Sequence, residues 1–329
     1  MTHKPLCKVW AASCAPDGGI AQYEMNAEGK LSRRSFLSMD RPMYFIKEGD
    51  TLHTLLRAPE GLEGESGYVK INVALGAETV TLPLSTHGVV ACHLCALGGR
   101  VYAVNYLSGS IAEIGGSVVV HTPAPDHVPG RQDAPHTHCV IPTAEGDALF
   151  CTDLGLDKIF IYDLELHLLS ECPMPKGHGV RHLTAGEGNL YYAVNELAST
   201  VSVLRYHPQS HVLTCLSTVS CGVSTEGNTA AAIRRNRAGD RLYVSHRGAD
   251  CVSVFAIEEK GTSLRLLENL PVGGRGPRDI CLSPDERFLL SANEGSGTLT
   301  VLDLQSHPAG ALVEEQPLPA ALCVACELF

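Results

Sequence analysis

Five apolar runs in this chain end in a polar residue and recur at a nearly constant interval. They end at Asn105, Asp153, Asn195, His246 and Asn293, so the spacings are 48, 42, 51 and 47 residues. A turn of Gly, Ser or Asp follows each run, and then comes a stretch such as STVSVLRY or GTLTVLDL. Apolar and polar residues that alternate in this way between turns predict β-strands rather than helices.

A repeat of roughly 40–50 residues with about four strands per unit is typical of a β-propeller. Weaker copies near Cys14 and Lys47 bring the number of units to seven in 329 residues. The stretch LCVACEL (residues 322–328) predicts a strand that completes the first blade and covers its edge. We therefore expect an all-β fold: one seven-bladed β-propeller domain over residues 1–329, with four-stranded antiparallel blades around a central channel. A β-sandwich or a solenoid of similar period is the alternative.

Charge and composition exclude several classes of protein. A formal net charge of −11 argues against a nucleic-acid partner, because neutralising phosphates requires a basic surface. No run of 18 apolar residues occurs and the first residues lack the apolar stretch of a signal peptide, so we expect no membrane association. Thirteen scattered cysteines predict free thiols in a reducing cytoplasm. The pair of histidines in PHTH lacks an acidic third ligand, so no metal is expected.

Propeller topology places the start of each blade's first strand and the end of its second strand on one rim. Polar residues recur at both places. Asn105, Asp153, Asn195 and Asn293 are expected to hydrogen-bond the turns that follow them, and Arg278 is a candidate for a rim ion pair with Glu294.

A further set of rim residues carries ionisable groups that change type from blade to blade. It consists of His138, Arg181, Glu196 and Arg247. A purely structural position would use one residue type each time, whereas an acid–base group, a carboxylate and two guanidinium groups together suit a site for a small anion. We expect these four to form the functional site. The neighbouring polar residues expected to bind substrate are His136, His182, Asn228 and Arg278.

Several of these stretches together resemble the seven-bladed propeller lactonases, which include bacterial propeller-type 6-phosphogluconolactonases and fungal carboxymuconate lactonising enzymes. The stretches are APHTHCV…LFCTDLGLDKIFIYDL, GHGVRHL…LYYAVNELASTVSVLRY, EGNTAAAIRRNRAGDRLYVSHRGADCVSVFAI, GGRGPRDICLSPDERFLLSANEGSGTLTVLDL and VYAVNYLSGSI. The resemblance covers roughly residues 88–305 and is weak over residues 1–85.

The resemblance implies the same catalytic quartet, His138, Arg181, Glu196 and Arg247. The chain departs from the family at two neighbouring positions. His246 stands where the family usually has Asn, and Val180 stands where it usually has Pro.

The resemblance also implies an enzyme that hydrolyses 6-phosphogluconolactone to 6-phosphogluconate, a step of the pentose phosphate pathway. Glu196 or His138 would be the general base. One of Arg181 and Arg247 would face the oxyanion, and the other would bind the phosphate. No nucleophile turn of the type Gly-x-Ser-x-Gly is present, and no cofactor is expected. The alternatives are a lactonising cycloisomerase that acts on a muconate and a propeller that only binds an anionic ligand or a protein.

Overall fold

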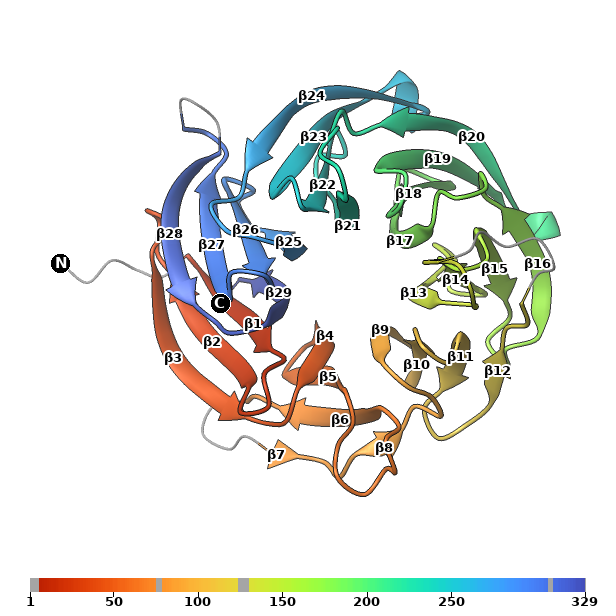
Figure 1. Ribbon diagram of the computed structural model, residues 1–329, viewed down its shortest axis with the longest axis horizontal. Helices are drawn as coiled ribbons and strands as arrows, with labels where there is room; N and C mark the ends of the chain where they lie inside the picture. The colour runs from red at the N-terminus through yellow and green to blue at the C-terminus, as the bar shows by residue number, and fades with distance from the viewer. Residues whose placement is uncertain (1–5, 75–78, 124–129, 307–309, 329) are drawn as a thin grey trace. The chain divides into compact units, whose positions relative to one another are not determined.

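The computed structural model describes residues 6–74, 79–123, 130–306 and 310–328. Within these ranges the regular structure is β-strand apart from two short turns of 3-10 helix, η1 (Pro208–Ser210) and η2 (Glu259–Gly261). None of the described helical segments is long and apolar enough to cross a membrane. The strands form seven antiparallel sheets, six with four strands and one with a fifth. The fold is a seven-bladed β-propeller, as the sequence repeat predicts (Figure 1).

The chain divides into two compact units. The four-sheet unit comprises residues 43–219 and 260–263, and the three-sheet unit comprises residues 1–42, 220–259 and 264–329. The prediction that residues 1–329 form one domain stays a prediction.

The four-sheet unit carries its sheets in chain order (Figure 1). Its strands are β4 (Pro42–Glu48), β5 (Thr51–Leu56), β6 (Gly67–Asn72), β7 (Thr79–Val80) and β8 (Leu84–Ser85); β9 (Ala91–Leu97), β10 (Arg100–Asn105), β11 (Ser110–Glu113) and β12 (Val118–Val120); β13 (Thr137–Pro142), β14 (Leu149–Asp153), β15 (Lys158–Tyr162) and β16 (Leu168–Pro173); and β17 (Val180–Ala185), β18 (Leu190–Asn195), β19 (Thr200–His207) and β20 (Val212–Ser220). The first strands of neighbouring sheets contact one another, β9 with β13 and β13 with β17.

The three-sheet unit combines the start of the chain with its last third. Its strands are β1 (Cys7–Ser13), β2 (Gly19–Met25), β3 (Leu31–Ser38) and β29 (Ala321–Glu327); β21 (Thr229–Arg235), β22 (Arg241–Arg247), β23 (Cys251–Glu258) and β24 (Ser263–Pro271); and β25 (Pro277–Leu282), β26 (Phe288–Asn293), β27 (Thr298–Asp303) and β28 (Ala311–Pro317). The last strand, β29, pairs with β1 in the order β29-β1-β2-β3. This confirms that residues near the C-terminal end complete the first blade.

Apolar side chains fill the space between neighbouring sheets. Between β13–β16 and β17–β20, the ring of Phe150 meets Tyr191 and Tyr206 edge to face, at centroid distances of 4.8 and 5.0 Å. All three side chains are almost fully buried. Because such rings each bury roughly 150–250 Å², they fix how the two sheets pack.

The repeated Asn at the end of the second strand binds hydroxyl groups of the third strand. Asn195 Nδ2 donates to Thr200 Oγ1 and to Ser202 Oγ, both at 2.9 Å. Asn293 Nδ2 donates in the same way to Thr298 (3.3 Å) and Thr300 (2.9 Å). Asn195 and Asn293 thus have a structural role, but their bonds reach across the turn to residues five and seven positions later rather than to the turn itself.

Replacing Asn293 by Ala is expected to lower the free energy of unfolding by about 1–3 kcal/mol, because two buried hydroxyl groups lose a partner. Urea unfolding measures the change. The matched control is Asn26→Ala, which removes a turn residue that is only partly buried and should cost less. Equal losses in the two variants would contradict the role assigned to the repeated Asn.

Candidate functional site

The first strand of several blades contains one residue more than its partner strand. In the pairing of β13 with β14, Thr137 faces Asp153 and Cys139 faces Thr152, so His138 is the extra residue. Arg181 is the extra residue of β17 in the same way, and Cys92 that of β9. Such β-bulges turn a side chain away from the regular alternation and are frequent beside active sites. These three blades therefore present a different functional group at one equivalent position.

Glu196, directly after β18, is held at the start of β17. Its backbone N–H donates to the carbonyl oxygen of Gly179 at 2.7 Å. Gly179 has a φ of +64°, and a Cβ there would lie 2.6 Å from the Leu197 side chain. The tight turn thus requires glycine, and it fixes the position of the Glu196 carboxylate.

The Glu196 carboxylate pairs with two guanidinium groups. Its Oε2 lies 3.0 Å from Arg181 Nε, and both of these side chains are only 2% exposed. Its Oε1 accepts a hydrogen bond of 2.6 Å from Arg131, whose side chain is 53% exposed. Two arginines held by one carboxylate form a rigid donor set for oxygen anions.

Arg131 and Tyr106 are site residues that the sequence analysis missed. Arg131 Nη2 also approaches the hydroxyl of Tyr106 at 3.4 Å, and the Tyr106 ring stacks on His136 with centroids 4.3 Å apart. Both residues lie in loops outside the repeated strand pattern, so periodicity gives no signal for them. The position of Arg131 in the short stretch GRQDAPHTH, beside two histidines, is the one clue that the sequence offers.

His136 and His138 are held in different ways. His136 Nδ1 lies 3.0 Å from the carbonyl oxygen of Tyr106, and since a carbonyl only accepts, this nitrogen carries the proton. His138 has its Nδ1 3.8 Å from the Sγ of Cys92, the extra residue of the neighbouring blade. The ring of His138 also meets the rings of Tyr106 and His182 edge on, at 5.6 and 5.2 Å.

His182 joins the histidines to the ion pair. Its Nε2 lies 3.2 Å from Arg181 Nη1, which only donates, so Nε2 is the acceptor. Its ring also meets His93 at 5.2 Å, and His93 Nε2 is hydrogen-bonded to the Tyr44 hydroxyl at 3.1 Å. The four-sheet unit thus brings five predicted residues into one continuous set of contacts: His136, His138, Arg181, His182 and Glu196.

The other three predicted residues, Asn228, Arg247 and Arg278, lie in the three-sheet unit. The amide of Asn228 is used within its own blade, because Nδ2 contacts His246 Nδ1 at 3.1 Å and Oδ1 accepts the Ala249 N–H. Arg278 forms the expected ion pair with Glu294 at 3.1 Å. Arg247 ends β22, and its catalytic role stays a prediction.

His246, the departure from the family pattern, is fully buried and hydrogen-bonded to Ser253 at 2.9 Å. Burial lowers its pKa from the ordinary 6.5 to about 4. Between these two pH values the unfolded chain binds more protons than the folded chain, so stability falls as the pH falls.

The His246→Asn variant should therefore lose part of this pH dependence. Between pH 8 and pH 5, the free energy of unfolding of the wild-type protein is expected to fall by roughly 2 kcal/mol more than that of the variant. Urea unfolding measures the difference. His207→Asn replaces an exposed histidine and serves as the control. An unchanged pH dependence in His246→Asn would show that His246 is not the buried titrating group.

In the parts of the chain that the structure describes, no group of three or more His, Cys, Asp or Glu side chains has the geometry of a metal site. The donor set of the candidate site is instead cationic and aromatic, which suits an anionic organic ligand.

The model of the family described as lactonase, 7-bladed beta-propeller, matches residues 8–326. The chain belongs to this family. It is 27% identical to a 6-phosphogluconolactonase from Bacillus subtilis, over 93% of each protein.

Two solved structures extend the likeness. A periplasmic gluconolactonase from Pseudomonas aeruginosa is 25% identical and superposes with a TM-score of 0.84, covering 98% of this chain and 99% of that one. A putative 6-phosphogluconolactonase from Bacteroides fragilis superposes with a TM-score of 0.86 over 99% of both chains. Because its identity is 22%, this second structure supports the fold alone.

Proposed function

We propose that this lactonase-family protein hydrolyses 6-phosphoglucono-1,5-lactone to 6-phosphogluconate at the site in the four-sheet unit. The observation that carries the proposal is the buried carboxylate of Glu196, which pairs with Arg181 and Arg131 beside His138 and His136. The Bacillus subtilis and Pseudomonas aeruginosa relatives, named for 6-phosphogluconolactone and gluconolactone chemistry, support the substrate class.

His138 is the general base of the proposed reaction. It takes a proton from a water molecule that attacks the lactone carbonyl, and it returns the proton to the ring oxygen when the C–O bond breaks. Each oxygen of Glu196 already faces a guanidinium group, so we assign Glu196 to holding the arginines rather than to proton transfer. The sequence leaves Glu196 and His138 open as candidates for the general base, and the proposal selects His138.

The two arginines stabilise different negatively charged groups of the substrate. Arg181 is buried and fixed by Glu196, so it suits the carbonyl oxygen, whose charge grows in the transition state. Arg131 is half exposed, so it suits the phosphate group, which stays solvated as the substrate enters. All thirteen cysteines are free thiols, which supports a reducing, cytoplasmic location for the reaction.

Substrate preference tests the role of Arg131. Arg131→Ala should lower kcat/KM for 6-phosphogluconolactone by about 10- to 100-fold, which corresponds to a charge-assisted hydrogen bond. The same variant should change kcat/KM for unphosphorylated glucono-1,5-lactone much less. Arg57→Ala removes an exposed arginine of the same unit and is the control. Equal losses of kcat/KM on both lactones would contradict phosphate binding by Arg131. In a separate assay of the wild-type protein, cyclisation of a carboxymuconate without lactone hydrolysis would favour the alternative function, a lactonising cycloisomerase.

A further inference from the structure

A cavity of about 430 Å³ lies on the three-sheet unit, away from the rim residues of that unit. It is formed at one end of three strands, each at the edge of its own sheet: at Arg235 of β21, Leu282 of β25 and Glu327 of β29. The rim residue Arg278 lies at the opposite end of β25. The proposed lactonase chemistry uses none of the residues that line this cavity.

Two cysteine thiols lie together in the wall of the cavity. Cys281 Sγ of β25 and Cys326 Sγ of β29 are 3.1 Å apart, although the residues are 45 positions apart in the chain. Both residues line the cavity; Cys281 is 9% exposed and Cys326 is partly buried. A disulfide has an S–S distance of about 2.05 Å, so the two sulfurs need to approach by roughly 1 Å.

The strands that carry the two thiols are fixed to each other and to β21. Arg234 Nη2 lies 2.5 Å from Asp279 Oδ1, and Asp279 Oδ2 accepts the backbone N–H of Val324 at 3.1 Å. Asp279 therefore connects all three strands. Because the strands are held in this way, the two sulfur atoms can approach each other without rearrangement of the sheets.

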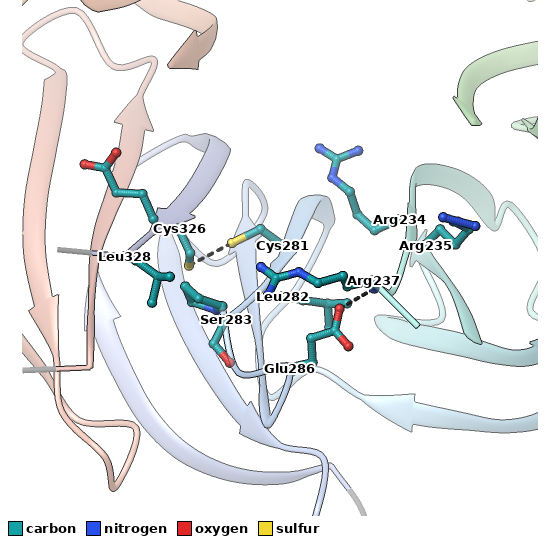
Figure 2. Close-up of a pocket in the computed structure, with 11 residues that line it drawn as sticks. Arg234, Arg235, Arg237, Cys281, Leu282, Ser283, Glu286, Cys326 and Leu328 are labelled. Atoms are coloured by element: carbon teal, nitrogen blue, oxygen red, sulfur yellow. Dashed lines mark hydrogen bonds between the residues drawn. The ribbon is translucent and has the colours of Figure 1, made fainter. Parts of the chain in front are cut away.

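Three arginines and two glutamates line the cavity, a small excess of positive charge on a chain with a formal net charge of −11. Arg234, Arg235 and Arg237 line it, and Figure 2 shows Arg234 and Arg235 on one side of the pocket and the two cysteines on the other. Arg234 is paired with Asp279. Among the described residues, the guanidinium groups of Arg235 and Arg237 form no ion pair with a carboxylate. Their charges are thus available to a small molecule that carries carboxylates.

The carboxylates in the cavity wall have partners of their own. Glu286 accepts the backbone N–H of Arg237, as the dashed line in Figure 2 marks, and Glu327 accepts the indole N–H of Trp10 at 3.1 Å. These contacts fix the positions of both acids but leave their negative charges in place, so an incoming anion meets two glutamates as well as the arginines.

We propose that this cavity is a site of thiol–disulfide exchange, in which a small disulfide that carries carboxylates oxidises Cys281 and Cys326 to an intramolecular disulfide. The Cys281 thiolate attacks one sulfur of the small disulfide and expels one small thiolate, which leaves a mixed disulfide. The Cys326 thiolate then attacks the Cys281 sulfur and expels the second small thiolate. The two protein thiols lose two electrons, the small disulfide gains them, and two protons pass to the leaving thiolates.

The assignment of the attacking sulfur follows from the hydrogen bonds of the pair. Hydrogen bonds with Cys281 and Cys7, together with burial, raise the pKa of Cys326 well above its ordinary value. The raised pKa disfavours the thiolate form of Cys326, and the proposal therefore gives the first attack to Cys281. This order makes Cys326 the resolving thiol of the pair.

The reduced full-length chain is treated either with glutathione disulfide, which is anionic, or with bis(2-hydroxyethyl) disulfide, which is neutral. The neutral reagent tests the exchange of the thiols alone, and the anionic reagent also tests the role of the arginine charges. Peptide mass mapping should find a bond between Cys281 and Cys326 after either reagent. Cys281→Ser should abolish this bond, whereas Cys215→Ser, which changes a partly buried thiol of the other unit, should leave it intact. No bond, or a bond between other cysteines, would overturn the proposal.

The arginines are tested by a double variant, Arg235→Ala with Arg237→Ala. It should react about threefold to tenfold more slowly with glutathione disulfide at low ionic strength, and at the wild-type rate with the neutral disulfide. Arg241→Ala, which removes an exposed arginine paired with Asp240, is the control. Equal slowing with both disulfides, or no slowing with either, would overturn the role of the charged pocket. Lactone hydrolysis is measured separately, so a failure here leaves the proposed function standing.

Discussion

The His138→Gln variant is expected to open 6-phosphogluconolactone about 10²- to 10⁴-fold more slowly than the wild-type protein, which is the usual contribution of a general base. Gln keeps the polar character of the side chain but cannot take up a proton from water. Stopped-flow measurement of proton release gives kcat and KM separately, and the loss should fall on kcat because the base acts in the transition state.

The control for this variant is His167→Gln, which replaces an exposed histidine in the same unit. Urea unfolding should show that His138→Gln still folds. Added imidazole should restore part of the rate to a His138→Gly variant, because the small base can enter the space left by the side chain. A His138→Gln variant with near-normal kcat would remove His138 from the base role and return it to Glu196.

Glu196→Gln is the second variant for which a large effect is expected. It removes the charge that pairs with Arg181 and Arg131 and places an amide where two guanidinium groups need an acceptor. We expect kcat to fall about 10²- to 10³-fold, comparable to the loss of an oxyanion donor, because the arginines lose their fixed position. The free energy of unfolding should fall by about 3 kcal/mol, since one partner of a buried ion pair is lost.

Glu187→Gln changes an exposed carboxylate between β17 and β18 and is the control for Glu196→Gln. Imidazole should not rescue the Glu196→Gln variant, which separates a positioning role from a base. Full activity of Glu196→Gln in a folded protein would contradict the account of the site.

The sequence repeat predicted the blades and the ends of their second strands. Asn105, Asp153, Asn195 and Asn293 are each the last residue of a strand, as the alignment of the repeats requires. These positions are predictable because the side chain serves a local purpose: Asn195 and Asn293 bind hydroxyl groups of the next strand, and Asp153 accepts the backbone N–H of Leu156 in the turn that follows. The blade that contains β4–β8 shows only the weaker copy of the repeat near Lys47, and its strands β7 and β8 have two residues each.

The geometry of the site was only partly predictable. His138, Arg181 and Glu196 stand out by residue type, but the extra residue that each first strand contains is a property of strand pairing. The sequence of a single strand does not show its register with the neighbouring strand. The bulges at His138 and Arg181 are therefore seen only in the structure. Arg131 was missed for a related reason: it reaches Glu196 across 65 positions from a loop without periodicity.

The most direct test of the account is the rate at which the wild-type protein opens freshly prepared 6-phosphogluconolactone, compared with the spontaneous rate in the same buffer. Proton release follows the reaction, because hydrolysis of the lactone yields a carboxylic acid that ionises at neutral pH. We predict a rate far above the spontaneous one, saturable in substrate and unchanged by a chelator. A rate equal to the spontaneous one, with folded protein, would contradict the proposal that this chain is a lactone hydrolase.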